Sequence, residues 1–312
     1  MKLSEITGQY VAHKQSMGMR FRTEQRTLKS FCWTMGDIAI AEVGAAQVLA
    51  FIAGTGPVTR FWHRKHEVLV GFYRFAIARG HCASSPLPKL VPKRPQAFVP
   101  YIYSHEELRR LLEATSSCEH PCCKVRAYTY RALILLLYGA GLRISEALAL
   151  TLQDVSLSTA LIQIRESKFY KTRLVPLGPD LVNVLTRYAS QRKQDHAAQP
   201  DNPFFVSRSG SAIKLWAADV IFSRLRRHAR VQRHDGGRFQ PRLHDLRHSF
   251  AVHRLISWYR QGADVQRLLP QLATYLGHVE IAATQRYLSM TPELLREASK
   301  RFERYAWEEA HE

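Results

Sequence analysis

The sequence lacks the features that mark membrane-spanning and secreted proteins. Its longest uninterrupted apolar run, residues 132–142, has 11 residues, which is too few for a helix to cross a bilayer. The first residues, Met1 to Glu5, lack the apolar segment of a secretory signal. Cysteine is scarce and odd in number, with five in 312 residues, so we expect a reducing cytoplasm and no disulfide framework. These absences predict a cytoplasmic protein that does not associate with membranes.

Several common catalytic motifs are absent as well. The chain has no GxxxxGK[ST] phosphate loop, no HExxH helix, no GxSxG elbow and no CxxC pair at zinc-ribbon spacing. The nearest group of metal-ligand residues is Cys118, His120, Cys122 and Cys123. Four ligands this close along the chain cannot easily surround one tetrahedral ion. We therefore predict no metal and no cofactor, and we interpret this segment as a surface turn.

Positive charge is what the sequence has in excess. It contains 45 Lys and Arg against 26 Asp and Glu, for a formal net charge of +19. Arginine accounts for 33 of the 45, and its planar fork can hold two phosphate oxygens at once. Residues 1–95 alone carry a net charge of +9. This balance favours a nucleic-acid partner over a basic surface that serves only solubility.

A proline-rich segment divides the chain. Five prolines between residues 84 and 100 cannot continue a helix, so we interpret residues 84–100 as an interdomain linker. Its basic residues suit it to cross a phosphate backbone, and they are candidate DNA contacts: Lys89, Lys93 and Arg94.

The segment before the linker is predicted to be a separate all-helical, DNA-binding domain over residues 1–83. Helical patterns cover residues 3–16, 23–35, 42–53 and 58–79, and Gly80 suits the end of the last one. Arg60, Arg64 and Lys65 lie outside the apolar positions of that last helix. They are further candidate DNA contacts.

The segment after the linker, residues 101–290, is predicted to be mainly helical with a small β-hairpin, an α+β domain. Ser104 is a good N-cap, and the apolar residues 130–138 predict a buried central helix that Gly139 and Gly141 end. Two short β-type runs, residues 161–165 and 173–177, flank a polar loop. Helix is expected again over residues 180–193 and, after a second polar loop, from residue 204 to the end.

The residues that could perform chemistry are scattered along this second domain. Arg143 follows the glycine break in GAGLRISEALAL, and Lys168 lies in the hairpin loop SKFYK. His244 and Arg247 stand at i and i+3 in LHDLRHSFA, which places them on one face of a helix. His278 ends TYLGH, and Tyr287 follows in TQRYL. Taken singly, each has an ordinary structural explanation, because a lone histidine or tyrosine is usually a hydrogen-bonded core residue.

As an ordered set, these motifs resemble those of the tyrosine recombinase (phage integrase) family, in a compact, Xer-like form, over residues 99–288. The resemblance implies the catalytic set Arg143, Lys168, His244, Arg247, His278 and Tyr287. Glu146 matches an acidic position that supports the first arginine. The usual Gly-Lys-Gly of the family is Ser167-Lys168-Phe169 here, and Lys171 in the same loop is a candidate DNA contact.

The resemblance also implies how these side chains divide the work of a phosphodiester transesterification without a metal. Arg143 and Arg247 would clamp the non-bridging oxygens of the transition state. The pKa of a free tyrosine is about 10, so at neutral pH a base must accept its proton. The position of His244 in the family motif implies that it is this base. Lys168 would protonate the leaving 5′-oxygen, and His278 would hydrogen-bond the phosphate.

The expected function is site-specific DNA recombination through a 3′-phosphotyrosine, for integration, transposition or dimer resolution. The expected partners are double-stranded DNA with inverted-repeat half-sites, further copies of the chain in a tetramer on a Holliday junction, and sister recombinases. The expected location is the cytoplasm, on the nucleoid. Two alternatives stay open: a catalytically silent DNA-binding or architectural protein, and a type IB topoisomerase-like enzyme that only relaxes supercoils.

The last segment, residues 291–312, is predicted to be a C-terminal helix. Thr291 can cap it, and Pro292 suits its first turn. Its apolar residues, among them Leu294, Leu295 and Phe302, recur along one side. That side could pack on its own domain or, as in related recombinases, be exchanged with a neighbouring subunit.

Overall fold

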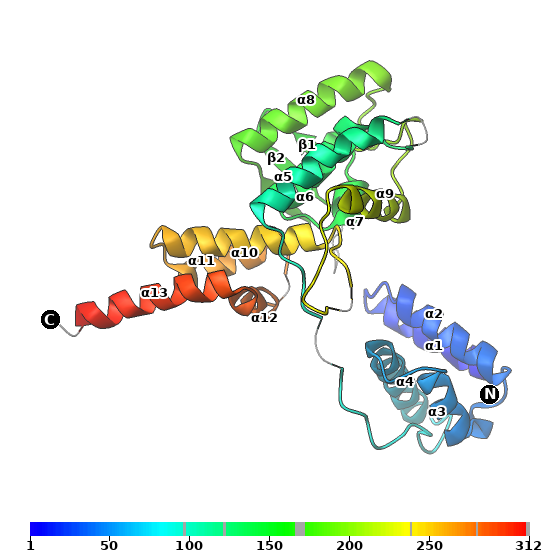
Figure 1. The fold of residues 1–312 in the computed structure, drawn as a ribbon. Coiled ribbons are helices and arrows are strands. Elements are labelled where there is room, and N and C mark those ends of the chain that lie inside the picture. The colour runs from blue at the N-terminus through cyan, green and yellow to red at the C-terminus, as the bar shows by residue number, and fades with distance from the viewer. Residues whose placement is uncertain (96–97, 121–122, 166–171, 238, 279, 310–312) are drawn as a thin grey trace. The chain divides into compact units, whose positions relative to one another are not determined.

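The computed structural model describes residues 1–95, 98–120, 123–165, 172–237, 239–278 and 280–309 (Figure 1). The chain divides into two compact units, Met1–Ala97 and Phe98–Glu312, each with a hydrophobic core of its own. Helices dominate both units, and one small antiparallel sheet lies in the second, which confirms the predicted fold class. Within the described ranges, no helix is long and apolar enough to cross a membrane.

The first unit contains four α-helices and a short 3-10 helix: α1 (Leu3–Ser16), α2 (Arg22–Met35), η1 (Ile40–Glu42), α3 (Ala45–Ala53) and α4 (Arg60–Ala78). The four α-helices form at the predicted positions, within three residues at each end. Thr59 caps α4 by accepting a hydrogen bond from the backbone N–H of Trp62 at 3.4 Å. Gly80 has a φ of +72°, the left-handed backbone that ends the helix as predicted.

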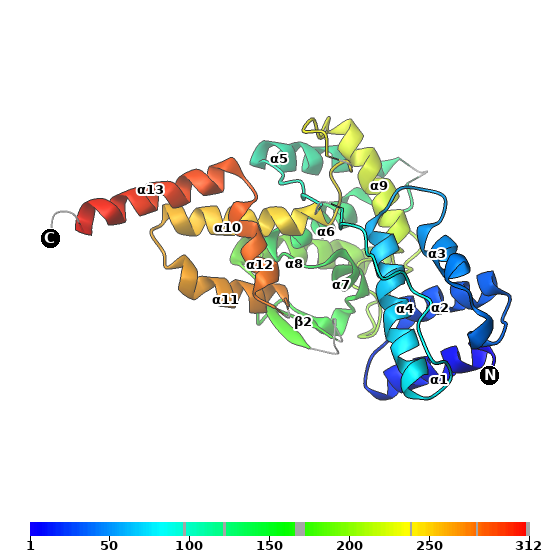
Figure 2. The ribbon, with the colours of Figure 1, turned by 90° about the horizontal axis from the view of Figure 1, so that it is seen from below.

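In chain order, the elements of the second unit fall into three successive stretches, of which the last is gathered at one end of the unit (Figure 2). The first is α5 (His105–Ala114), η2 (Thr115–Glu119), α6 (Ala127–Gly139), α7 (Ile144–Ala149) and η3 (Leu152–Asp154). The second is the sheet, β1 (Val155–Ser156), β2 (Leu161–Ile164) and β3 (Arg173–Pro176), followed by α8 (Pro179–Asp195) and α9 (Leu215–His228). The third is α10 (Asp245–Arg260), α11 (Val265–Leu276), α12 (Ala282–Gln285), η5 (Arg286–Ser289) and α13 (Pro292–Glu309).

Helix α6 is the centre of the second unit, as its apolar sequence predicts. Leu133, Leu136 and Leu137 are each at most 1% exposed, and the helix packs against both α8 and α10. Its N-terminal neighbour α5 begins with the predicted cap, in which Ser104 accepts from the backbone N–H of Glu107 at 3.1 Å. Because α6 ends at Gly139, the chain turns at once into the segment that carries Arg143.

The three strands pair antiparallel in the order β1-β2-β3, with Ile162 opposite Val175. Side chains alternate across β3, so that Leu174 is 59% exposed while Val175 is fully buried. Arg173 shares the inner face with Val175, and its side chain is only 11% exposed. The predicted hairpin is therefore confirmed, β1 is an addition to it, and the sheet directs an arginine into the domain.

The prediction of continuous helix from residue 204 onward is wrong. Residues 203–214, 229–237 and 239–243 are not helical, and Phe204 and Phe205 are buried in an irregular segment. Arg192, itself 2% exposed, donates hydrogen bonds to the carbonyls of Pro203 and Phe204 and holds that segment in place. A short apolar run does not reveal whether a side chain of the preceding helix will donate hydrogen bonds to its backbone carbonyls.

The last group of helices surrounds a second core in the same unit. Phe250 and Leu255 of α10, Leu272 of α11 and Leu294 of α13 belong to it, together with Tyr287 of η5. Thr291 caps α13 as predicted, because its hydroxyl accepts from the backbone N–H of Leu294 at 3.1 Å. The tail helix is thus anchored at its start, and it extends from there along α10 (Figure 1).

Candidate active site

The C-terminal end of α11 organises the candidate site. The carbonyls of residues 275, 276 and 277 each accept a hydrogen bond from a different arginine. Arg173 donates to the first at 3.1 Å, Arg247 to the second at 2.6 Å and Arg143 to the third at 3.0 Å. The last carbonyls of a helix have no partner within it and carry its negative partial charge, so they hold cations well. Residues from three separate elements are brought together in this way.

Gly277 makes this arrangement possible. Its φ of +67° is left-handed, and an added Cβ would lie 2.8 Å from Nη1 of Arg173. The glycine therefore ends α11 in a turn that an arginine can approach closely, and it leads directly into His278. In the motif LGH, the backbone carbonyls of the leucine and the glycine bind arginines of the site, so these two residues contribute to the site together with the histidine.

Glu146 is shared by two of the three arginines. Its carboxylate accepts from Nη1 of Arg143 at 2.7 Å, and it forms a two-bond pair with Arg173 at 3.0 and 2.8 Å. Burial alone would raise the pKa of Glu146, but the hydrogen bonds and charge of Arg173 and Arg143 lower it to about 2. Glu146 is thus ionised at neutral pH and holds both side chains in place.

The site as a whole keeps an excess of positive charge. Among the described residues, Glu146 is the only carboxylate that forms an ion pair with Arg143, Arg173 or Arg247. Burial, followed by repulsion from Arg143, lowers the pKa of Arg247 to about 10. Arg247 still carries its charge at neutral pH, although its side chain is almost fully buried. Three cations against one anion in a largely buried place make a site for a further anion.

Arg247 is fixed by backbone carbonyls on two sides. Besides the carbonyl of Leu276, it donates to the carbonyl of Gly141 at 2.7 Å. Gly141 has a φ of +60°, and an added Cβ would lie 2.5 Å from Cδ1 of Phe250. The glycine break after α6 therefore supplies both a turn and one of the acceptors of Arg247.

Tyr287 lies inside the domain beside these arginines and is only 2% exposed. Its hydroxyl is hydrogen-bonded to Nδ1 of His248 at 3.1 Å. Burial raises the pKa of Tyr287, while the charges of Arg247 and Arg143 act in the opposite direction. The site therefore places a tyrosine hydroxyl next to unneutralised positive charge.

Neither of the two predicted histidines has a described hydrogen bond to the hydroxyl of Tyr287. His244 directly precedes α10 with helical dihedral angles, and its ring meets that of His248 edge-on at 4.9 Å. The ring of His278 stacks near Tyr287 at 6.1 Å, and its Nδ1 is hydrogen-bonded to Thr284 at 2.6 Å. Burial, with the charge of Arg247, lowers the pKa of both histidines to about 4, so both are neutral at pH 7.

The structure thus brings together Arg143, Glu146, His244, Arg247, His278 and Tyr287. Lys168 and Lys171 lie outside the described residues. The sequence reasoning did not find Arg173 and His248. Strand alternation puts Arg173 on the inner face with Val175, and the i, i+4 spacing puts His248 on the same face as His244, so both signals were present.

The candidate DNA contacts of the first unit differ in how exposed their side chains are and in the contacts that they make within the unit. Lys89 and Lys93 are exposed. Arg64 is paired with Glu24 at 3.3 Å and Arg94 with Glu67, but both side chains are at least half exposed. Lys65 donates to the carbonyl of Phe51 at 2.6 Å and lies over two aromatic rings, so it also stabilises the end of α3. Arg60 is exposed at the start of α4.

The cysteine-rich segment is described only in part, since Cys122 lies outside the described residues. Cys118 is buried, and burial together with the neighbouring Cys123 raises the pKa of its thiol to about 12. Neither of these two cysteines is in a disulfide. A thiol with so high a pKa is a poor nucleophile.

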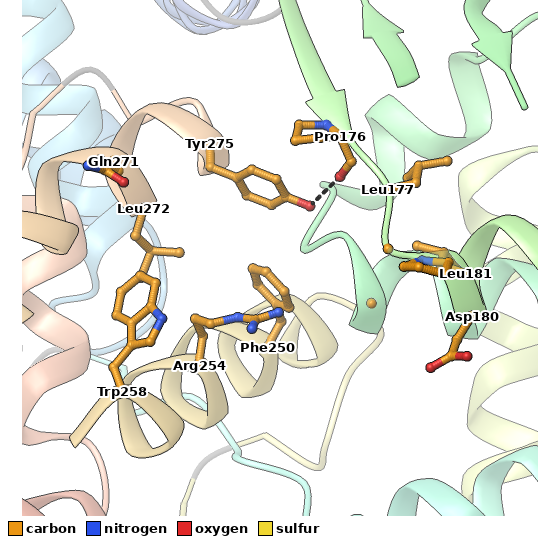
Figure 3. Close-up of a pocket in the computed structure, with 13 residues that line it drawn as sticks. Pro176, Leu177, Asp180, Leu181, Phe250, Arg254, Trp258, Gln271, Leu272 and Tyr275 are labelled. Atoms are coloured by element: carbon orange, nitrogen blue, oxygen red, sulfur yellow. Dashed lines mark hydrogen bonds between the residues drawn. The ribbon is translucent and has the colours of Figure 1, made fainter. Parts of the chain in front are cut away.

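A separate apolar pocket of about 590 Å³ opens between α10, α11 and the start of α8 (Figure 3). Phe250 and Trp258 project into it from α10, and Leu272 and Tyr275 from α11. The hydroxyl of Tyr275 donates to the carbonyl of Pro176 at 3.3 Å and closes one side. Because Tyr287, His248 and Arg247 do not line it, this pocket is distinct from the arginine cluster.

Comparison with known proteins agrees with the geometry. Residues 102–293 match the model of the phage integrase family. A protein named integrase/recombinase y4rB, from Sinorhizobium fredii, is 36% identical over 96% of both chains. Tyrosine recombinase XerC of Chlorobaculum parvum is 30% identical over 75% of this chain and 70% of its own. The Tn1549 transposon integrase, solved with transposon right end DNA, has the same fold, with a TM-score of 0.70 at 16% identity over 98% of this chain and 100% of its own.

Proposed function

The chain belongs to the phage integrase family of tyrosine recombinases, and we propose on this basis that it cuts and rejoins DNA at specific sites through Tyr287. The observation that carries the proposal is the charge of the site. Three arginines lie beside a tyrosine hydroxyl, and the one carboxylate paired with them contacts only Arg143 and Arg173, which leaves positive charge for a phosphodiester.

We propose that Arg143 and Arg247 bind the non-bridging oxygens of the scissile phosphate. As the oxygen of Tyr287 attacks phosphorus, negative charge grows on these oxygens, and fixed guanidinium groups stabilise it without reorganising. In this role the arginines supply charge that a metal ion provides in other phosphoryl-transfer sites. The carbonyl bonds at the end of α11 and the pairing with Glu146 support the proposal, because they fix both side chains beforehand.

The remaining steps require a group that protonates the leaving 5′-oxygen and a nucleophile that rejoins the strand. The bond from phosphorus to Tyr287 forms as the bond to the 5′-oxygen breaks, and we assign the proton for that oxygen to Lys168. His244 and His278 are proposed to line the phosphate on the remaining sides. Attack by a 5′-hydroxyl of another strand on the 3′-phosphotyrosine then restores the phosphodiester, so rejoining needs no added energy source.

The assembly that we propose is a tetramer on DNA with inverted-repeat half-sites, which passes through a Holliday junction. Sister recombinases are a further proposed partner. Each copy is proposed to grip the duplex with both units, using Arg60, Arg64, Lys65, Lys89, Lys93 and Arg94 before the catalytic unit and Lys171 within it. The large positive charge of residues 1–95 supports this grip and predicts strong salt dependence.

We propose that α13 joins neighbouring copies in this assembly. Its first turn is anchored by Leu294, but Leu295 and Phe302 are 51% and 72% exposed. The pocket in Figure 3 is lined mostly by apolar residues, and at about 590 Å³ it is large enough to admit apolar side chains of another helix. A second copy of this chain, through the apolar side of its α13, is the proposed occupant.

The substitution Tyr287→Phe tests the proposed nucleophile. It removes only the phenolic oxygen, so site-specific DNA binding should persist while covalent attachment disappears. The measurement uses a duplex nicked close to the cleavage site, which traps the wild-type protein as an adduct that survives SDS. A normal yield of adduct from the variant would show that another residue attacks.

A second measurement distinguishes recombination from relaxation. Two duplexes that carry the site should exchange strands when wild-type protein is added. A protein that changes the linking number of a plasmid but produces no exchanged strands would be a topoisomerase instead.

A further inference from the structure

The hydroxyl of Tyr287 has one neutral base bonded to it. His248, which no family motif used above assigns to a role, places Nδ1 3.1 Å from that oxygen. Tyr287 is 2% exposed, so solvent cannot readily accept its proton. The hydrogen bond therefore singles out the group that is positioned to receive this proton when the oxygen attacks.

The other two histidines are less well placed for this task. Nδ1 of His278 is already bonded to Thr284 at 2.6 Å. His244 forms no hydrogen bond with Tyr287 among the described residues, and its ring contacts that of His248 edge-on, with the centroids 4.9 Å apart. The expectation that His244 takes the proton came from its motif, whereas the geometry favours its neighbour one turn along α10.

We propose that His248 is the general base for Tyr287, an inference that rests on the proposed recombinase function. As the bond from the tyrosine oxygen to phosphorus forms, the phenolic proton passes to Nδ1, and the histidine becomes an imidazolium. In the rejoining step, the tyrosine is the leaving group and recovers the proton from Nδ1. Nδ1 must be the unprotonated nitrogen in the resting site, so Nε2 carries the hydrogen.

The surroundings of His248 suit a base that starts neutral. Cationic or titratable groups face it from the elements that pack there: Arg242 and His244 before α10, Arg247 on α10, His278 after α11, and Tyr287 on η5. The positive charge of the arginines disfavours an imidazolium and favours a phenolate. During the reaction, the negative charge of the bound phosphate offsets the repulsion between the arginines and an imidazolium, so that the proton can move to His248.

The chain offers a matched control on the same helix. His253 of α10 also uses Nδ1 in a hydrogen bond to a tyrosine hydroxyl, that of Tyr138, at 2.9 Å. This second pair lies outside the arginine cluster. The variants are therefore His248→Asn, whose amide oxygen can accept the hydrogen bond but not the proton, His248→Ala, and His253→Asn as the control.

The experiment measures single-turnover formation of the covalent adduct by the full-length protein on the nicked duplex. Both His248 variants should bind DNA normally but react about 100-fold more slowly or worse near neutral pH, while His253→Asn stays within about threefold of wild type. The deficit should shrink as the pH rises from about 7 to about 9.5, because ionised phenol needs no base. A defect of packing would keep a constant ratio to wild type at each pH.

A substrate with sulfur in place of the leaving 5′-oxygen separates the base from the acid. A thiolate leaves without a proton, so this substrate should restore the reaction of a Lys168→Ala variant and not that of His248→Asn. Restoration of His248→Asn, a wild-type rate for that variant, or a ratio that does not change with pH would each overturn the assignment. If the wild-type protein forms no adduct at all, the proposed function itself fails and the assignment fails with it.

Discussion

At the residue scale, the two arginines proposed to hold phosphate differ in how much of the fold depends on them. Arg143 has a side chain that is 25% exposed and bonds one carbonyl, whereas Arg247 is 2% exposed and bonds two. Lysine keeps the positive charge but lacks the planar guanidinium group that can donate two parallel hydrogen bonds. The same substitution should therefore have different effects on stability at the two positions.

Both substitutions, Arg143→Lys and Arg247→Lys, should slow cleavage by about 100-fold or more, since each removes a donor for the developing charge. Arg247→Lys should also lower the free energy of unfolding by about 1–3 kcal/mol, because a buried carbonyl loses its partner. Urea unfolding and adduct formation, measured on the same preparations, check both effects. Equal losses of unfolding free energy in the two variants would contradict the prediction that the more deeply buried Arg247 contributes more to stability.

Glu146 predicts a pH dependence of stability. Its pKa in the folded chain is about 2, below the free value of about 4.3. A lowered pKa contributes stability that is fully present above about pH 4.3 and is lost as the pH falls through about 2, in total about 3 kcal/mol. The difference in unfolding free energy between wild type and Glu146→Gln should thus be largest near neutral pH and shrink below about pH 4.5. A difference that stays constant down to about pH 2.5 would show that the carboxylate charge contributes nothing.

The residues of the site were predicted from sequence where the family resemblance assigns them a role. Arg143, His244, Arg247, His278 and Tyr287 are found in this way, and the structure places them together. Strand alternation could place Arg173 on the inner face, but its partners could not be predicted, because Glu146 lies 27 residues earlier and the acceptor carbonyl 102 residues later. Contacts over such separations depend on the packing of whole elements, which no local pattern describes.

At the element scale, the position of Arg247 depends on the turn that follows α6. Gly141 supplies a carbonyl to Arg247 from a left-handed conformation packed against Phe250 and Leu276. Alanine there would be strained in its backbone and would overlap the phenyl ring. The helix end and the arginine would have to move together.

Gly141→Ala should therefore destabilise the protein by about 3 kcal/mol and reduce adduct formation, even though the side chain of residue 141 contacts no DNA in the proposed mechanism. Gly178→Ala is a suitable control, since no atom lies within 4 Å of its added Cβ, and it should cost less than about 1 kcal/mol. Thermal unfolding followed by circular dichroism measures both. Similar losses for the two variants would contradict the role of the close contact.

Elements with strong periodicity were predicted well, and irregular ones were not. The spacing of apolar residues predicts α1 with its observed ends, and the unbroken apolar stretch predicts the buried α6. The segment around Phe204 and Phe205 begins with a short apolar run, residues 204–206, but buried hydrogen bonds from Arg192 fix it without a helix. Periodicity reports which face is buried and does not report where the backbone finds its partners.

At the scale of the whole molecule, the question is how one copy of the chain contacts the next. The start of α13 is secured within its own chain by Leu294 and by an ion pair of Glu293 with Arg260 at 2.6 Å. Deleting the whole helix would disturb that core, so it would be a poor test of exchange. Phe302 is a better position, because it is 72% exposed and its loss should not affect the single chain.

Phe302→Asp should leave the affinity for a single half-site unchanged and weaken cooperative binding to a full site by about tenfold, the effect of losing about 1.4 kcal/mol at an interface. Trp258→Ala, which opens the pocket of Figure 3, should have the same effect from the other side of the contact. Gel-shift titrations on half and full sites measure both quantities.

A mixture of the two variants distinguishes exchange from local packing. A Trp258→Ala subunit keeps an intact tail, and a Phe302→Asp subunit keeps an intact pocket, so one of the two contacts in a mixed pair is restored. Cooperativity in the mixture should then exceed that of either variant alone. If the mixture behaves as the average of its components, the tail of one copy does not occupy the pocket of another. In that case the exposed side of α13 has a different partner, and the arginine cluster and Tyr287 are assembled without it.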